Sequence, residues 1–346
     1  MVNKKLGGKK MKIIKIISTI GIALTLLVGC GNNATKTADT STKVDLSKVT
    51  IVVGETGWKS KEIGFKEAGL DNTHYKVEYV NFQGGNLQLE AMAADHLDLA
   101  LTSEIPPIFA SQAQNGGNFK IIGIQQGTTL QQELVVPKDS PIKNVADLKG
   151  KQVAYVDSTT AHYFLLKMLE KAGLSWSDIT PVKLSTSDGL TALIGGKVDA
   201  LASYGNAIIS AKQKGATTLA SAKDILSGNF PIEATPDAIA DPAKHAAIVD
   251  YLERYNKFYE WSRQNKDKWA KITADNTKQP VEQALATLKE GEEQRPSKIV
   301  ATSKDAISSE QDIADIFTKV GLLKNKVDVS SFWSNAFDDE IKKFSK

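Results

Sequence analysis

Apolar and polar residues in the first part of the chain follow a repeating order of short elements. Val49–Val53 is β-branched and Leu97–Leu101 is apolar, as buried strands are, whereas Lys76–Phe82 alternates between apolar and polar residues. Between these strands, Lys59–Ala68 and Leu87–Ala94 carry apolar residues at helical spacing. The order strand, helix, strand, helix, strand predicts a parallel sheet covered by helices.

The same order recurs about one hundred residues later. Its predicted strands and helices are, in chain order, Gln152–Val156, Ala161–Lys171, Ile179–Leu184, Leu190–Ile194 and Val198–Ala202. The stretch that begins at Glu90 aligns without gaps on the stretch that begins at Thr191, so that Asp98 falls on Asp199. The chain therefore contains two units of one plan, which indicates an internal duplication, although two amphipathic segments can also resemble each other by chance.

Two such units predict an α/β fold with two doubly wound domains and a central cleft. Strand-like Glu133–Pro137 is expected to cross into the second domain, and Phe230–Ala234 is expected to cross back. The remaining C-terminal part is largely helical and is expected to complete the outer surface of the first domain. The predicted boundaries are 48–133 plus 234–346 for domain 1 and 134–233 for domain 2.

The N-terminal segment has the pattern of a secretory signal. Residues 1–29 contain six lysines and no acid, with an apolar run from Ile16 to Val28 that is short for a membrane span. The ending Leu-Val-Gly-Cys30 resembles the bacterial lipobox, whose cysteine is acylated. We predict a signal peptide at 1–29 that begins at Met1 or Met11, lipidation of Cys30, and a polar tether at 30–47. The mature protein would lie at the outer face of the cell membrane; an uncleaved anchor is the alternative.

Composition excludes several classes of function for the mature protein. After the signal, 37 basic and 40 acidic side chains remain, which is unsuited to nucleic acid. Cys30 is the only cysteine, so disulfides and cysteine-based metal sites are excluded. The histidines show no metal-ligand spacing, and phosphate-loop, serine-hydrolase and zinc-protease motifs are absent. We therefore expect no cofactor, no metal and no enzyme.

The loops that follow the predicted strands are rich in hydroxyls, amides and glycine. The carboxyl ends of parallel strands form ligand sites, so these loops of the two units are expected to meet across the cleft. The predicted ligand-binding residues in them are Trp58, Gln83, Ser103, Glu104, Ser158, Thr159, Thr160, His162 and Tyr204. Such loops suit hydrogen bonding better than acid–base catalysis.

The loop at 158–160 precedes a predicted helix, whose unpaired N–H groups and dipole favour an anion. All three arginines lie outside the strand-end loops. We therefore expect neutral donors to hold a small organic anion, although Ser158 or Thr159 could simply cap the helix. Trp58 and Tyr204 would cover an aliphatic tail or belong to the core. For Glu104 the alternatives are a structural acceptor and a partner for a ligand ammonium.

The chain resembles the substrate-binding proteins of aliphatic sulfonate ABC importers, a group that includes taurine- and nitrate-binding proteins. The resemblance runs from about Val49 to Val329. The stretches that carry it include Phe82-Gln-Gly-Gly, Thr102-Ser-Glu-Ile-Pro-Pro-Ile-Phe, Glu133-Leu-Val-Val-Pro-Lys-Asp-Ser-Pro, Ser158-Thr-Thr-Ala-His-Tyr and Lys171-Ala-Gly-Leu-Ser-Trp. Where such proteins usually have Trp-Asp-Pro-Tyr, this sequence has Ser203-Tyr-Gly-Asn, which leaves the exact substrate open.

The resemblance implies a type II periplasmic-binding-protein fold, a monomer that closes on its ligand, and a permease and an ATPase as partners. The function predicted is extracytoplasmic capture of an aliphatic sulfonate for sulfur uptake. Alternatives are taurine, nitrate, a carboxylate or a pyrimidine precursor as ligand, an enzyme acting on a small anion, and an adhesin or sensor that kept the fold.

Overall fold

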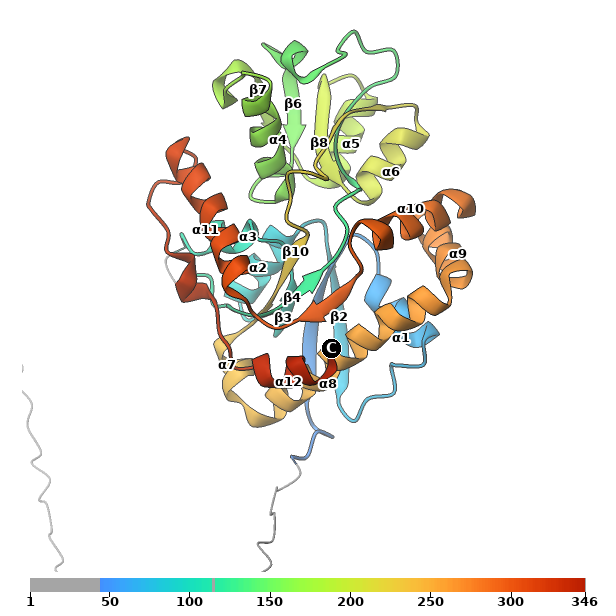
Figure 1. Ribbon diagram of the computed structural model, residues 1–346, viewed down its shortest axis with the longest axis vertical. Coiled ribbons are helices and arrows are strands. Elements are labelled where there is room, and N and C mark those ends of the chain that lie inside the picture. Colours follow the sequence, from blue (N-terminus) through green and yellow to red (C-terminus); the bar gives the residue numbers. More distant parts are fainter. Residues whose placement is uncertain (1–43, 114–115, 346) are drawn as a thin grey trace, which may run out of the picture. The chain divides into compact units, whose positions relative to one another are not determined.

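The computed structural model of the protein describes residues 44–113 and 116–345, and Val44–Lys346 form one compact unit (Figure 1). The predicted signal peptide, Cys30 and most of the predicted tether lie outside the described residues. Within the described part, no helix has both the length and the apolar character that a membrane crossing requires.

The first sheet has six strands in the order β11-β4-β10-β3-β1-β2. Its strands are β1 (Thr50–Thr56), β2 (Lys76–Phe82), β3 (Leu99–Leu101), β4 (Lys120–Gln126), β10 (Asn229–Ala234) and β11 (Lys298–Val300). Strands β2, β1 and β3 are parallel, and β10 then pairs with β3 in the antiparallel sense.

The second sheet repeats this plan with five strands in the order β7-β6-β8-β5-β9. Its strands are β5 (Gln132–Val136), β6 (Gln152–Tyr155), β7 (Thr180–Lys183), β8 (Ala200–Tyr204) and β9 (Thr217–Ser221). Strands β7, β6 and β8 are parallel, and β5 is antiparallel to β8. In each sheet the first strand of the unit, β1 or β6, thus lies between the second and third strands of that unit, which confirms the two-unit α/β fold. The exact domain boundaries remain a prediction.

Two aspartates show that the units are built alike. The Asp98 carboxylate accepts the Val52 N–H of β1 at 2.9 Å, and the Asp199 carboxylate accepts the Gln152 N–H of β6 at 2.8 Å. Each aspartate precedes the third strand of its unit and fixes the beginning of the first strand.

Helices cover both faces of each sheet. The helices are α1 (Ser60–Glu67), α2 (Gly85–Ala93), α3 (Pro106–Ala110), α4 (Thr160–Lys171), α5 (Thr186–Ile194), α6 (Asn206–Gln213), α7 (Pro236–Ala240), α8 (Pro242–Gln264), α9 (Lys266–Thr277), α10 (Val281–Gln294), α11 (Lys304–Lys319) and α12 (Asp338–Phe344). Phe65 of α1 packs with α8 on one face of the first sheet, whereas Leu89 of α2 packs with α3 and α11 on the other. Figure 1 shows these two groups of helices on opposite sides of the sheet.

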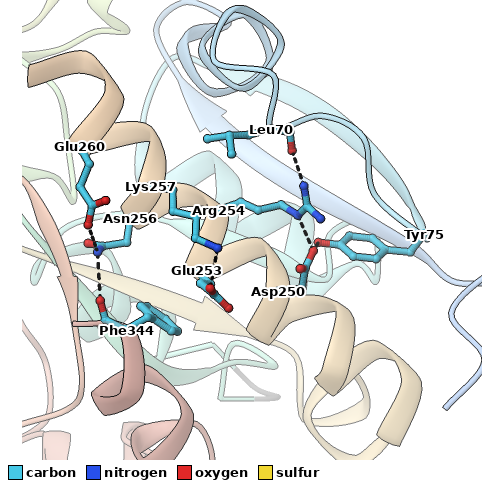
Figure 2. Close-up of polar contacts among 9 residues, drawn as sticks. All are labelled: Leu70, Tyr75, Asp250, Glu253, Arg254, Asn256, Lys257, Glu260 and Phe344. Carbon is cyan, nitrogen blue, oxygen red and sulfur yellow. Dashed lines mark hydrogen bonds and ion pairs between the residues drawn. The ribbon is translucent and has the colours of Figure 1, made fainter. Parts of the chain in front are cut away.

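Helix α8 ties the C-terminal part to the first sheet, as the sequence predicted (Figure 2). Arg254 binds Asp250 at 2.6 Å and donates to the Leu70 carbonyl at 3.0 Å, and the Tyr75 hydroxyl donates to Asp250 at 2.8 Å. On another side of the helix, the Asn256 amide donates to the carbonyl of Phe344 at 3.2 Å. These bonds join α8 both to the loop before β2 and to the end of α12.

Candidate functional site

A cavity of about 450 Å³ lies between the carboxyl ends of the two sets of parallel strands. Thr56, Gly85 and Ser103 line it from the first unit, and Thr159 and Tyr204 line it from the second. Helices α9 and α10 close one end with Thr273, Thr277, Gln279, Thr287 and Leu288. Hydroxyl and amide groups alternate with apolar surface in its wall, which is the composition of a small-molecule site.

Helices α2, α4 and α6 are among those that begin at this cavity. Helices α2 and α6 follow Gly84 and Gly205, which have no side chain to cap the exposed N–H groups, and Gly85 and Asn206 line the cavity. Helix α4 follows Thr159, whose hydroxyl accepts the Ala161 N–H at 3.3 Å. Because unpaired N–H groups and helix dipoles attract negative charge, the wall favours an anion without needing an arginine.

The loops of the two units touch across the cavity. The Gln83 side-chain oxygen accepts bonds from Thr186 Oγ1 at 3.0 Å and from Ser187 Oγ and N at 2.8 and 3.2 Å. The Tyr204 hydroxyl donates to the Gln83 carbonyl at 3.4 Å. A methyl group on Gly84 would lie 2.9 Å from the Tyr204 hydroxyl oxygen. Gln83 thus bridges the units, a role that the sequence did not indicate.

The structure brings six of the nine predicted residues into the cavity wall. They are Trp58, Gln83, Ser103, Thr159, Thr160 and Tyr204. The other three, Glu104, Ser158 and His162, do not line it. Ser158 precedes Thr159 with a φ of 55°, and its N–H donates to His162 Nδ1 at 3.4 Å.

Glu104 is a structural acceptor in this arrangement. It is 3% exposed, and its carboxylate accepts the Ser227 hydroxyl at 2.5 Å and the Asn229 amide at 3.4 Å. Burial raises the pKa of Glu104, and the bonds from Ser227, Ser309 and Asn229 together with nearby Arg295 oppose that rise. With its oxygens engaged outside the cavity wall, Glu104 is not placed to pair with a ligand ammonium.

His162 packs between the two units. Its ring lies 5.7 Å from Phe109 and 5.0 Å from Phe317 of the first unit, and 4.9 Å from Tyr155 and from Trp176 of the second. Burial lowers its pKa to about 4, although Asp157, 3.4 Å away, favours the charged form. His162 is therefore neutral at pH 7 and serves as an aromatic contact.

This contact predicts an acid-sensitive part of the stability. The folded pKa of His162 is about 4, below the ordinary 6.5, so the unfolded chain takes up the proton first as pH falls. The stability from neutral His162 is therefore complete above about pH 6.5 and is lost as pH falls through the folded pKa. Lowering the pH from 7 to 4.5 should reduce the free energy of unfolding of both proteins. Because phenylalanine cannot titrate, we expect this reduction to be smaller in His162→Phe than in the unaltered protein, by on the order of 2 kcal/mol. Urea unfolding at both pH values measures this, and equal losses would contradict it.

The expectation of a wall made only of neutral donors is wrong at one end of the cavity. Lys61, in the first turn of α1, lines it. The Glu55 carboxylate positions that turn, because it accepts the N–H groups of Lys61 and Glu62, each at 3.1 Å. Burial lowers the pKa of Lys61, and the charge of Glu55 opposes the shift. Sequence reasoning considered the arginines and the loop residues, and so missed a lysine just inside a helix.

Gln132 is a second residue that the sequence did not indicate. It lies on β5, is 7% exposed and lines the cavity, and its buried side-chain oxygen has no hydrogen-bond partner in the described structure. A buried amide without a partner is costly, which suggests that it is satisfied when the cavity is filled. No group of three or more potential metal ligands occurs among the described residues.

Comparisons with known proteins agree with this geometry. Residues 61–230 match the family described as NMT1/THI5 like. A protein of Escherichia coli (strain K12) named for aliphatic sulfonate binding is 30% identical over 260 residues, which cover 73% of this chain and 78% of that protein. The chain belongs to the aliphatic sulfonate-binding protein family.

Solved structures of sulfonate-binding proteins share the fold. The alkanesulfonate-binding protein SsuA from Xanthomonas axonopodis pv. citri, bound to MOPS, superposes with a TM-score of 0.73 at 27% identity, covering 82% of this chain and 98% of that one. The periplasmic aliphatic sulphonate binding protein SsuA from Escherichia coli gives 0.67 at 26% identity, covering 82% and 91%. These relatives are binding proteins, and family membership places this chain among binding proteins rather than enzymes.

Proposed function

We propose that this chain is the substrate-binding lipoprotein of an ABC importer, which captures an aliphatic sulfonate outside the membrane and delivers it to the permease. The observation that carries the proposal is the cavity at which α2, α4 and α6 begin, two of them uncapped. A sulfonate is ionised at every physiological pH and offers three acceptor oxygens to such N–H groups. Family membership and the resemblance of the cavity loops support the same ligand class.

The size and lining of the cavity favour an organic ligand over nitrate. A volume of about 450 Å³ is within the range of small-molecule sites and far exceeds the needs of a four-atom ion. Leu101, Phe230, Ile209 and Leu288 supply apolar wall for an aliphatic tail. Taurine is less favoured, since Glu104 is engaged with Ser227 and Asn229 outside the cavity wall.

Titration of the mature protein tests the ligand class. We expect ethanesulfonate, butanesulfonate and MOPS to bind at least tenfold more tightly than nitrate or butanoate, because only the organic sulfonates combine three acceptor oxygens with an apolar tail. Isothermal calorimetry measures the affinities, and bound sulfonate should be recovered unchanged after prolonged incubation. A protein that binds nitrate or butanoate as tightly as it binds any of the sulfonates would contradict the proposal.

The lipoprotein part is tested separately. Cys30→Ser should prevent lipidation and release the protein from the membrane fraction, and the mass of the mature N-terminus should show the acyl groups on Cys30. A protein that stays membrane-bound after this substitution would contradict the anchor while leaving the ligand class intact.

A further inference from the structure

Lys61 lines the cavity, and its ammonium forms no ion pair with an acidic side chain of the described residues. No carboxylate in the described residues lies within ion-pair distance of its ammonium, which is 5.9 Å from the centre of the Tyr255 ring. Its neighbour Lys59 differs, because it pairs with Glu62 at 3.0 Å and is more than half exposed. Glu55 is held in place by two N–H groups of α1, so its charge mainly balances that helix end. Lys61 is therefore free to meet a negative group in the cavity.

Thr273 provides a second polar group at the same end. Its hydroxyl oxygen is buried without a hydrogen-bond partner, and the residue lines the cavity. On helix α9 it lies four residues after Trp269, and so on the same side of the helix. Trp269 in turn stacks on Trp58 at 5.6 Å, just before the first turn of α1. This chain of contacts places Thr273, Trp58 and Lys61 around one part of the cavity.

That part of the cavity lies beside α9, and it is joined to the segment before α2 by the Gly57 N–H, which donates to the Phe82 carbonyl at 3.0 Å. Helix α1 packs with α8 on one face of the first sheet, and the Trp58–Trp269 stack joins its start to α9. Helix α2 packs with α3 and α11 on the opposite face, where Tyr163 of α4 also contacts α11 through Phe317. Figure 1 shows α1, α9 and α10 on one side of the molecule and α2, α3 and α11 on the other. The cavity wall thus takes polar groups from both sides, Thr273 from α9 and Thr159 and Thr160 from the start of α4, together with apolar residues such as Leu101 and Leu288.

We propose that Lys61 and Thr273 form a second anion subsite, which binds a carboxylate at the far end of the sulfonate ligand. That a sulfonate binds in the cavity rests on the proposed function. That a carboxylate binds at the other end of the ligand rests on the Lys61 ammonium, which has no ion-pair partner, and on the Thr273 hydroxyl, which has no hydrogen-bond partner. A carboxylate there would accept a bond from each group, and the favoured ligand class is an ω-sulfoalkanoate rather than a plain alkanesulfonate.

Matched ligands and matched variants test the subsite. Calorimetry compares ω-sulfoalkanoates that have three to six carbons with alkanesulfonates of the same length, on the unaltered protein, on Lys61→Met and on Lys59→Met. We expect at least one sulfoalkanoate to bind tenfold or more tightly than its plain partner, because only the sulfoalkanoate reaches Lys61 with a charge. Lys61→Met should abolish this preference, because it weakens sulfoalkanoates more than alkanesulfonates of the same length, whereas Lys59→Met should leave the preference unchanged.

Two outcomes would overturn the subsite. If no sulfoalkanoate is preferred at any length, the far end does not take a carboxylate. If Lys61→Met weakens plain alkanesulfonates as much as sulfoalkanoates, Lys61 faces the sulfonate itself. In both cases tight binding of plain alkanesulfonates would leave the proposed function standing, and loss of all sulfonate binding by the unaltered protein would remove it instead. Melting temperatures of the variants establish that each is folded.

Discussion

Replacing Gly84 by alanine is expected to weaken sulfonate binding about 10- to 100-fold while the melting temperature stays nearly unchanged. Gly84 has a φ of −169°, which any residue adopts, so the backbone is not strained. Its added methyl would lie 2.9 Å from the Tyr204 hydroxyl oxygen and 3.7 Å from Thr159 Cγ2, both on the opposite unit. The clash is thus with the other unit, and on the proposal that the units close on the ligand it arises in the closed state.

Apart from these two contacts, the methyl meets only its own unit. The remaining close atom is Asn86 Oδ1 at 2.6 Å, the end of a side chain that can turn away. On the proposal of closure, the substitution lowers affinity without lowering the stability of an open form. Isothermal calorimetry and thermal unfolding without ligand measure the two effects.

A second substitution distinguishes this crowding from other causes. Tyr204→Phe removes the oxygen that the new methyl would meet, so Gly84→Ala combined with Tyr204→Phe should recover part of the affinity lost by Gly84→Ala alone. The four proteins form a double-mutant cycle, whose coupling energy isolates the contact. Affinity losses that simply add, or an unchanged affinity in Gly84→Ala, would contradict close approach of the two loops at this point.

Replacing Glu55 by alanine is expected to lower the free energy of unfolding by about 2–3 kcal/mol. Glu55 is 1% exposed, and its two oxygens accept the N–H groups of Lys61 and Glu62, each at 3.1 Å. Alanine leaves both donors without a partner at a partly buried helix end and removes a negative charge from the positive end of its dipole.

Urea unfolding at pH 7 measures the loss, and two variants calibrate it. Glu55→Gln keeps one acceptor oxygen and should lose about half as much. Glu62→Ala removes a carboxylate from the same turn that makes only an exposed pair with Lys59, and should change stability by less than about 0.5 kcal/mol. A Glu55→Ala protein as stable as Glu62→Ala would show that Glu55 does not fix the first turn of α1.

The sequence predicted the fold because its signals are local and repeated. Strand β2 spans the predicted Lys76–Phe82, and α8 (Pro242–Gln264) lies in the C-terminal part that was predicted to be largely helical. Parallel order followed from alternation of the elements, and the alignment of Asp98 with Asp199 correctly indicated two units of one plan.

Part of the site was equally accessible from sequence. The loops after parallel strands converge by topology, so Gln83, Ser103, Thr159 and Thr160 could be placed at the cleft before any contact was known. The start of the helix after Thr159 was also visible, because a hydroxyl residue before a helical pattern marks its N-terminus. The uncapped starts of α2 and α6 gave a weaker signal, because a glycine before a helix also occurs in many turns.

By itself, the sequence determined the class of fold, the duplicated plan, and the loops that meet at the cleft, because short-range periodicity specifies strands and helices and their order specifies the sheet. Only the tertiary structure decided which side chains face the cavity. Lys61 reaches it because Glu55 holds the first turn of α1, and Glu104 is directed away from it by Ser227 and Asn229. Such choices depend on contacts between residues far apart in the chain, and no local pattern records them.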